Sequence, residues 1–209
     1  MKFPVRGRRW VLTAPLLVLM AACSGADDEE QAGGDATVDT TPATTQAPTP
    51  PPPASASALT DGNIVAILGA SGNAEIVPSD SVRGRLENER VKRFAQQMIT
   101  QHTALNDTVS TVARQNNITA VPNAMSAHLD SISRATVERL RGLSGHQLDL
   151  AFMQYMVMSH DSAQQAVTKV LIPSTHNPQL LTTIQQGVLR MVEAHLAEAR
   201  QILASLGPS

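Results

Sequence analysis

The chain has 209 residues, with 16 Lys and Arg against 18 Asp and Glu, and a formal net charge of −2. This balance excludes the strongly basic composition that is typical of nucleic-acid-binding proteins. A single cysteine excludes an intramolecular disulfide, and an aromatic content of 2% leaves aliphatic residues and methionine to build a core.

Residues 1–22 are predicted to be a secretory signal peptide. Four basic residues precede an apolar stretch at residues 11–20, which is too short to span a bilayer as a helix. The stretch ends in two alanines before Cys23, and this arrangement resembles a bacterial lipobox, in which the cysteine is lipidated and becomes the new N-terminus. We therefore expect an exported lipoprotein of the cell envelope, anchored in the outer membrane and facing the periplasm. The alternative is an ordinary signal peptide with an incidental cysteine.

Residues 23–59 are predicted to be a disordered acidic tether rich in Pro, Thr and Ala. Residues 24–58 contain no aromatic, Ile or Leu side chain, so burial cannot offset the entropy of ordering this segment. Without the signal peptide, which holds four of the 16 basic residues and no acidic ones, the charge is 12 minus 18, or −6. Because this charge does not favour anionic lipid, we expect acyl chains on Cys23 to hold the protein at the membrane.

Residues 60–206 are predicted to form one all-α domain, since their apolar residues recur at helical spacing without strand-like alternation. The expected helices span about 60–86, 88–115, 124–141, 144–172 and 178–206. Short connections favour antiparallel neighbours, so the four long helices should form a four-helix bundle with residues 124–141 as an extra short helix.

Local signals predict how these helices begin and where the first one is disturbed. Thr60 or Asp61, Asn88 and Ser144 are expected N-caps, and Ser144 is expected to form a capping box with Gln147. Proline lacks an amide donor, so Pro78 should kink or interrupt the first helix near Ala74, whose carbonyl loses its partner.

Three of the long helices repeat one pattern, a methionine four residues before a histidine. The pairs are Met98 and His102, Met156 and His160, and Met191 and His195. Residues four apart lie on the same helix face, and each histidine interrupts an otherwise apolar stripe. On the first helix, Glu75 falls on the corresponding stripe. Each long helix thus carries one ionisable residue towards the interior.

These four residues predict a metal centre. Burying three imidazoles and a carboxylate without partners is costly, and a metal ion removes that cost. We therefore expect Glu75, His102, His160 and His195 to bind a transition metal, either copper or iron, with zinc also possible. Thioether ligands would favour copper, and Met98, Met156 and Met191 are the candidates. The alternative is that the histidines are hydrogen-bonded core residues and the methionines fill gaps.

No catalytic residue is predicted, because the chain lacks the motifs of nucleophilic catalysis and of phosphate binding. The expected role is metal binding or redox handling rather than hydrolysis. A non-catalytic envelope lipoprotein that acts in protein interaction or stress resistance without metal is the alternative. A di-iron oxidase is disfavoured, because the Glu-x-x-His pairs of ferritin-type centres are absent at these sites.

One stretch of the second helix resembles the hallmark of a known family, with VKRFAQQM at 91–98 and HTALN at 102–106. The family is a domain of unknown function found in predicted bacterial outer-membrane or periplasmic proteins with a ferritin-like helical bundle. YMVMSHD at 155–161 is similar to its second hallmark, His195 and Leu196 to its last, and Glu75 to its first-helix glutamate. The resemblance covers roughly residues 60–206 and implies a ferritin-like antiparallel four-helix bundle. The family has no settled activity, so the resemblance implies a fold more than a function.

Overall fold

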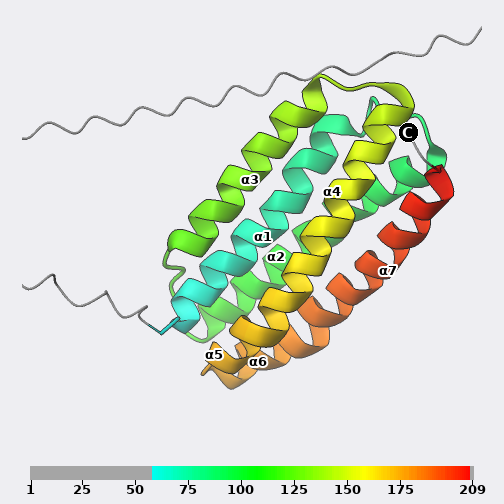
Figure 1. Ribbon diagram of the computed structural model, residues 1–209. Helices are drawn as coiled ribbons and strands as arrows, with labels where there is room; N and C mark the ends of the chain where they lie inside the picture. Colours follow the sequence, from blue (N-terminus) through cyan, green and yellow to red (C-terminus); the bar gives the residue numbers. More distant parts are fainter. Residues whose placement is uncertain (1–57, 208–209) are drawn as a thin grey trace, which may run out of the picture. The chain divides into compact units, whose positions relative to one another are not determined.

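The computed structural model describes residues 58–207, and the predicted signal peptide, Cys23 and nearly all of the predicted tether lie outside this range. The described part is all-α (Figure 1). Its first three helices are α1 (Asp61–Val82), α2 (Glu89–Gln115) and α3 (Ala124–Arg141). A fourth rod joins α4 (Gly145–Ala166), the π-helical segment η1 (Val167–Leu171) and α5 (Ile172–Ser174). The last rod joins α6 (Pro178–Thr183), η2 (Ile184–Val188) and α7 (Leu189–Leu206). Five rods are therefore present where five helices are expected.

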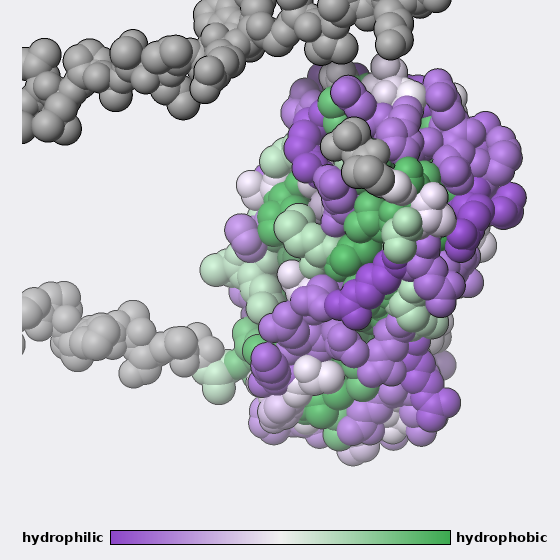
Figure 2. Space-filling model, turned by 45° about the vertical axis from the view of Figure 1, so that its right-hand side comes forward, coloured by the Kyte–Doolittle hydropathy of each residue, from purple (hydrophilic) through white to green (hydrophobic). Residues whose placement is uncertain are grey.

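The helices form the predicted bundle. α1 packs along α2 and α3, and α4 packs along α7, so α3 is the extra helix beside a bundle of four rods (Figure 1). The face drawn in Figure 2 is largely hydrophilic, with hydrophobic residues visible in hollows between the polar ridges. None of the helices within residues 58–207 is both long and apolar enough to cross a membrane.

Side-chain caps begin most of the rods. Thr60 and Asn63 form a reciprocal capping box at α1, Asn88 caps α2, and Asn177 caps α6. Ser144 is the N-cap residue of α4, as expected, but its side chain makes no capping hydrogen bond, so the predicted capping box is wrong. Gly145 enters the helix from the left-handed conformation, at φ 59°, and the Ser144 hydroxyl then does not reach the first-turn amides.

Of the kink or interruption predicted at Pro78, the interruption is wrong, because α1 continues through the proline to Val82, and the kink stays a prediction. The proline still deprives the Ala74 carbonyl of its helical donor. The buried Tyr155 hydroxyl of α4 donates a hydrogen bond to this carbonyl at 2.7 Å. A side chain from another helix thus satisfies the acceptor that the proline leaves free, and the same bond ties α1 to α4.

The core is divided into two apolar clusters. One contains Phe94, Met98 and Phe152, and the other contains Val109 and Leu180. On α2, Met98 belongs to the first cluster and Val109 to the second, and the one buried residue between them is His102. The boundary between the two clusters is therefore the level of the bundle at which polar side chains enter the interior.

Candidate metal centre

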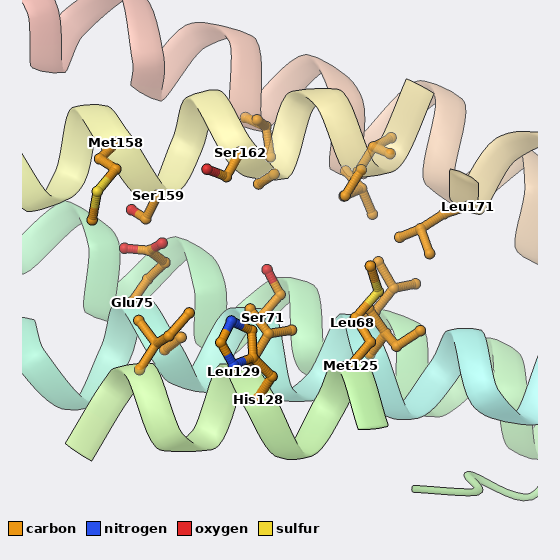
Figure 3. A pocket seen from close by; sticks show the side chains of 18 of the residues that line it. Leu68, Ser71, Glu75, Met125, His128, Leu129, Met158, Ser159, Ser162 and Leu171 are labelled. Carbon is orange, nitrogen blue, oxygen red and sulfur yellow. The ribbon is translucent and has the colours of Figure 1, made fainter. Parts of the chain in front are cut away.

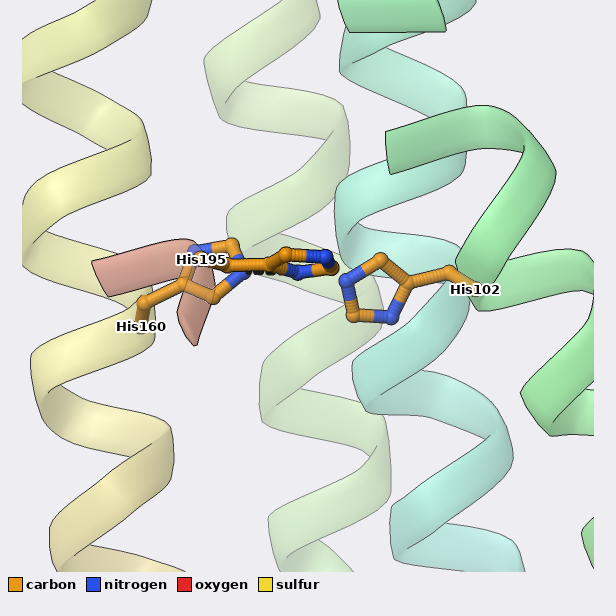
Figure 4. Close-up of side chains that lie close together, drawn as sticks. All are labelled: His102, His160 and His195. Atoms are coloured by element: carbon orange, nitrogen blue, oxygen red, sulfur yellow. Dashed lines mark hydrogen bonds between the residues drawn. The ribbon is translucent and has the colours of Figure 1, made fainter. Parts of the chain in front are cut away.

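Three buried histidines meet at this level, one from each of three rods: His102 of α2, His160 of α4 and His195 of α7 (Figure 4). Their solvent-exposed fractions are 4%, 1% and 1%. The ring centroids are 5.3 to 5.7 Å apart. One ring nitrogen of each histidine lies within 4.8 Å of the others. The structure therefore brings the three imidazoles together, although they are separated by up to 93 positions, from 102 to 195, in the sequence.

The outer nitrogen of His160 has a fixed role. Its Nδ1 lies 2.9 Å from the backbone carbonyl of Met156. A carbonyl only accepts, so in this contact Nδ1 carries the hydrogen and donates it. In the neutral ring, Nε2 is then the nitrogen with a free lone pair. The four-residue spacing between Met156 and His160 thus places the imidazole against a backbone carbonyl of its own helix.

His195 is oriented in the same sense by a side chain of another helix. Its Nε2 lies 2.5 Å from Oε1 of Gln101 on α2. The amide oxygen accepts, so Nε2 donates and Nδ1 keeps its lone pair in the neutral ring. A hydrogen bond from the outer nitrogen to a carbonyl or amide oxygen is the usual support of a metal-binding histidine.

The two inner nitrogens therefore face each other with lone pairs. Nε2 of His160 and Nδ1 of His195 are 3.3 Å apart (Figure 4). Two nitrogens bound to one ion at 2.0–2.1 Å with a tetrahedral angle lie about 3.3 Å apart. The pair can be held together by a metal ion between the nitrogens or, at low pH, by one shared proton. Two neutral rings with nothing between them would repel each other.

His102 completes the cluster from the opposite helix. Its Nε2 is buried and has no hydrogen-bond partner. The ligand nitrogens of the three rings are up to 4.8 Å apart. Two nitrogens bound to one ion at 2.0–2.1 Å are at most about 4.2 Å apart, so His102 would have to move inward by the order of 1 Å. An unpaired buried nitrogen is costly, and ligation would remove that cost.

Glu75 is buried nearby but does not share the inner side of the cluster. Its Oε1 lies 4.0 Å from Nδ1 of His160, which is the outer nitrogen of that ring. Its Oε2 has no hydrogen-bond partner. In this arrangement the carboxyl group lies behind His160, where second-shell carboxylates stabilise and orient metal-binding imidazoles. In this geometry Glu75 is not placed to bind an ion that lies between the inner nitrogens.

The three methionines of the repeated pattern differ in burial. Met98 and Met156 are fully buried in the first apolar cluster, whereas Met191 is half-buried. Each lies one helical turn before its histidine. Thioether ligation by these residues stays a prediction.

Burial and neighbouring charges keep the imidazoles of His102 and His195 neutral. Burial, and then the neighbouring charges of His160 and His195, lower the pKa of His102 to about 3. Burial, and then His160, lower the pKa of His195 to about 4. Burial raises the pKa of Glu75, while His160 and the Ser159 hydroxyl oppose that rise. Neutral imidazole is the form that binds a metal, so near pH 7 these two histidines are already in the ligand form.

Gln101 is the functional residue that the sequence did not reveal. It is a solvent-exposed residue next to His102 on α2, and its amide orients the histidine of α7. No spacing rule within one helix predicts that contact. The Met156 carbonyl was equally hidden, because the sequence pattern directs attention to the sulfur of that residue rather than to its backbone.

Fold and site together define an all-α bundle protein with a buried three-histidine cluster. The chain belongs to the family described as "Domain of unknown function (DUF4142)", whose profile matches residues 45–202. The match begins inside the predicted tether and covers all three histidines. No curated protein and no solved structure matches the chain. The predicted likeness to ferritin-type bundles therefore stays a prediction, and the function has to be inferred from the site.

Proposed function

We propose that this protein binds a transition-metal ion in the interior of its helical bundle, with His102, His160 and His195 as ligands. The observation that carries the proposal is the 3.3 Å approach of two imidazole nitrogens whose opposite nitrogens both donate to oxygen acceptors. Three imidazoles leave a further coordination position open, as in sites that bind or activate a small ligand. The role is metal binding or redox handling, with no hydrolytic nucleophile assigned.

Ligand type narrows the choice of metal. Three imidazole nitrogens suit copper and zinc, whereas non-haem iron sites add carboxylate ligands on the metal. Glu75 lies behind His160, so the donor set of this structure favours copper or zinc over iron. Movement of Met98 or Met156 onto the ion would favour Cu(I), since thioethers are soft ligands.

The test is a metal count on purified protein that has been stripped with a chelator and reloaded with Cu²⁺, Zn²⁺ or Fe²⁺ in separate samples. We expect one ion per chain in the wild type and a loss of at least tenfold in affinity in a His102→Ala/His160→Ala variant. The matched control is His128→Ala/His146→Ala, which removes two solvent-exposed histidines and should leave binding unchanged. Equal metal content in all three proteins would dismiss the centre and leave the non-metal alternative.

A spectroscopic readout keeps the test independent of how well the variants fold. Cu²⁺ bound by imidazoles shows nitrogen hyperfine structure in its electron paramagnetic resonance spectrum. We expect that hyperfine structure from the loaded wild type, and its absence would contradict imidazole ligation.

Replacing Gln101 by Ala removes the acceptor behind His195, and loss of such second-shell partners typically weakens metal affinity by about 10–100-fold.

We also propose that the bundle is held at the cell envelope by lipid on Cys23, which lies outside the described residues. Support comes from the sequence alone: a basic start, an apolar stretch and small residues before the cysteine. Expression in a bacterium with labelled palmitate should label the wild type and not a Cys23→Ser variant. Equal labelling of the two proteins would refute lipidation at this residue.

A further inference from the structure

A cavity of about 350 Å³ lies between α1, α3 and α4, with its far end reaching η1 (Figure 3). None of the three clustered histidines lines it. Its walls are mainly aliphatic, and the side chains that give it this character include Leu68, Met125, Leu129, Leu171 and Val192. Small-molecule sites in proteins are mostly apolar and range from about 300 to 1,000 Å³, so this cavity has the size and the lining of such a site.

Two polar side chains, Glu75 and Ser159, lie at one end of the cavity, and Ser71, Ser162 and His128 lie nearer its middle (Figure 3). Glu75 of α1 extends towards Ser159 of α4. The Glu75 side chain is almost fully buried, and its Oε2 has no hydrogen-bond partner. A buried carboxyl oxygen without a partner is costly, so it marks the position at which a ligand group would supply the missing hydrogen bond.

Charge limits the head group of such a ligand. No lysine or arginine is among the residues that line the cavity. The one basic side chain of the lining, His128 of α3, lies away from Glu75 (Figure 3), so an anionic head, such as the carboxylate of a fatty acid, would meet the Glu75 carboxyl without a cation beside it. An alcohol or an amine donates a hydrogen bond, and a carboxyl oxygen accepts one whether the group is ionised or neutral.

The shape of the cavity limits the body of the ligand. A helix with side chains is about 10–12 Å wide and needs far more room than this space offers. A narrow aliphatic chain fits between the apolar walls. Met158, which is 58% exposed and lines the cavity, provides a flexible apolar rim of the kind that adapts to hydrocarbon.

We propose that this cavity binds a small amphipathic molecule with an aliphatic body and a hydrogen-bond-donating head, an alcohol or a primary amine, whose head contacts Glu75. The site is separate from the proposed metal centre, although Glu75 lies between the two. Its occupancy does not require a metal ion on the histidines.

The test compares three ligands of equal chain length on chelator-treated wild-type protein by isothermal titration calorimetry. We expect octan-1-ol and octylamine to bind with a stoichiometry of one and at least ten times more tightly than octanoate. Tight binding of octanoate, or no binding of the alcohol and the amine, would overturn the proposal. This comparison needs no variant, so it does not depend on the folding of any mutant.

Two variants then locate the binding. Ala163→Phe on α4 fills the cavity and should weaken octan-1-ol binding by at least tenfold, whereas Ala204→Phe at an exposed position of α7 should not. Glu75→Leu should remove the preference for the alcohol over octanoate.

A His102→Ala/His195→Ala variant removes two ligands of the proposed metal centre but keeps His160 beside Glu75. It should bind octan-1-ol like the wild type, so failure of the metal proposal and failure of this one are distinguishable. Equal affinities for wild type and Ala163→Phe would place the ligand elsewhere and refute the site.

Discussion

Two polar sites of the bundle, Asp149 and the histidine cluster, are similarly buried but differ in whether the protein satisfies their hydrogen-bonding atoms. Asp149 of α4 is 2% exposed, and its two carboxyl oxygens accept from the backbone amides of Glu87 at 3.1 Å and Asn88 at 2.8 Å. His160 and His195 are buried as deeply, yet their inner nitrogens face each other without a donor between them in the neutral state. Where the protein completes the hydrogen bonds itself, the buried group is structural. Where lone pairs converge without partners, the site has room for a ligand.

The Asp149 site explains how two chain segments are joined. Asn88 caps α2 with its side chain, and its own backbone amide is held by α4 through Asp149. The carboxylate therefore connects the beginning of α4 to the turn before α2. The histidine cluster connects three rods as well, but its stability depends on what lies between the rings. Experiments that change protonation, or that remove a single partner, should separate the two sites.

The largest expected effect is the acid sensitivity of the metal-free protein. The pKa values of His102 and His195 are lowered to about 3 and about 4, below the ordinary value of 6.5. Below pH 6.5 these two histidines bind protons in the unfolded chain but stay neutral in the folded chain. Their contribution to the free energy of unfolding is therefore present above this pH and falls as the pH decreases towards 4. Well below pH 6.5 each histidine contributes about 1.4 kcal/mol per pH unit, but the unfolded imidazoles are only half protonated at pH 6.5, so about 3 kcal/mol should be lost between pH 6.5 and 5. Urea unfolding of chelator-treated protein at several pH values measures the loss.

Replacement of the two rings isolates their contribution. A His102→Leu/His195→Leu variant should lose most of this pH dependence, because leucine does not titrate. His128→Leu/His146→Leu, at two exposed positions, should keep it. Identical stability of the wild type at pH 7 and pH 5 would contradict the assignment of neutral buried imidazoles.

Removing the Asp149 carboxylate should have a smaller effect on stability, and this effect should not depend on metal. Asp149→Ala leaves the buried amides of Glu87 and Asn88 without acceptors, which should lower the free energy of unfolding by about 2 kcal/mol. Urea denaturation measures the change, with Asp130→Ala at an exposed position of α3 as the matched control. Metal stoichiometry should stay at the wild-type value. A change in metal binding without a change in stability would reverse the roles assigned to the two sites.

The smallest expected effect concerns the hydrogen bond that compensates for Pro78. Tyr155→Phe removes the donor to the Ala74 carbonyl while keeping the aromatic ring in the core. One buried acceptor is then unsatisfied, and we expect a loss of about 1 kcal/mol in the free energy of unfolding. A double variant that also carries Pro78→Ala restores the helical amide donor to the Ala74 carbonyl and should recover that loss. If Tyr155→Phe is as costly in the Pro78→Ala background as in the wild type, the tyrosine does not act through this carbonyl.

The sequence predicted the helical architecture well because the signals for it are local. Thr60, Asn88 and Asn177 stand at helix starts, and three-and-four apolar spacing defines each rod. The predictions that failed depended on more than one element. The helix is not interrupted at Pro78, and Tyr155, 77 positions after it, supplies the hydrogen bond that the proline cannot donate to Ala74. The capping box at Ser144 failed because Gly145 enters the helix at positive φ.

The same division holds for the site. Helical periodicity identified His102, His160 and His195 as the polar residues on the buried stripes. It treated Glu75 as an equal fourth member, whereas the structure places this carboxyl behind His160 and at the end of a separate cavity. Periodicity gives the direction of a side chain around its own helix axis. It does not give the rotation of the ring, or the height at which neighbouring helices meet.

By itself, the sequence determined five helical segments, their ends and the residues that turn inward, because these properties follow from backbone hydrogen bonding and solvent exclusion within each segment. Only the tertiary structure decided which nitrogens face one another, that Gln101 orients His195, and that Glu75 has an unpaired oxygen. Those features depend on distances between helices, and such distances are set by the packing of side chains from distant parts of the chain.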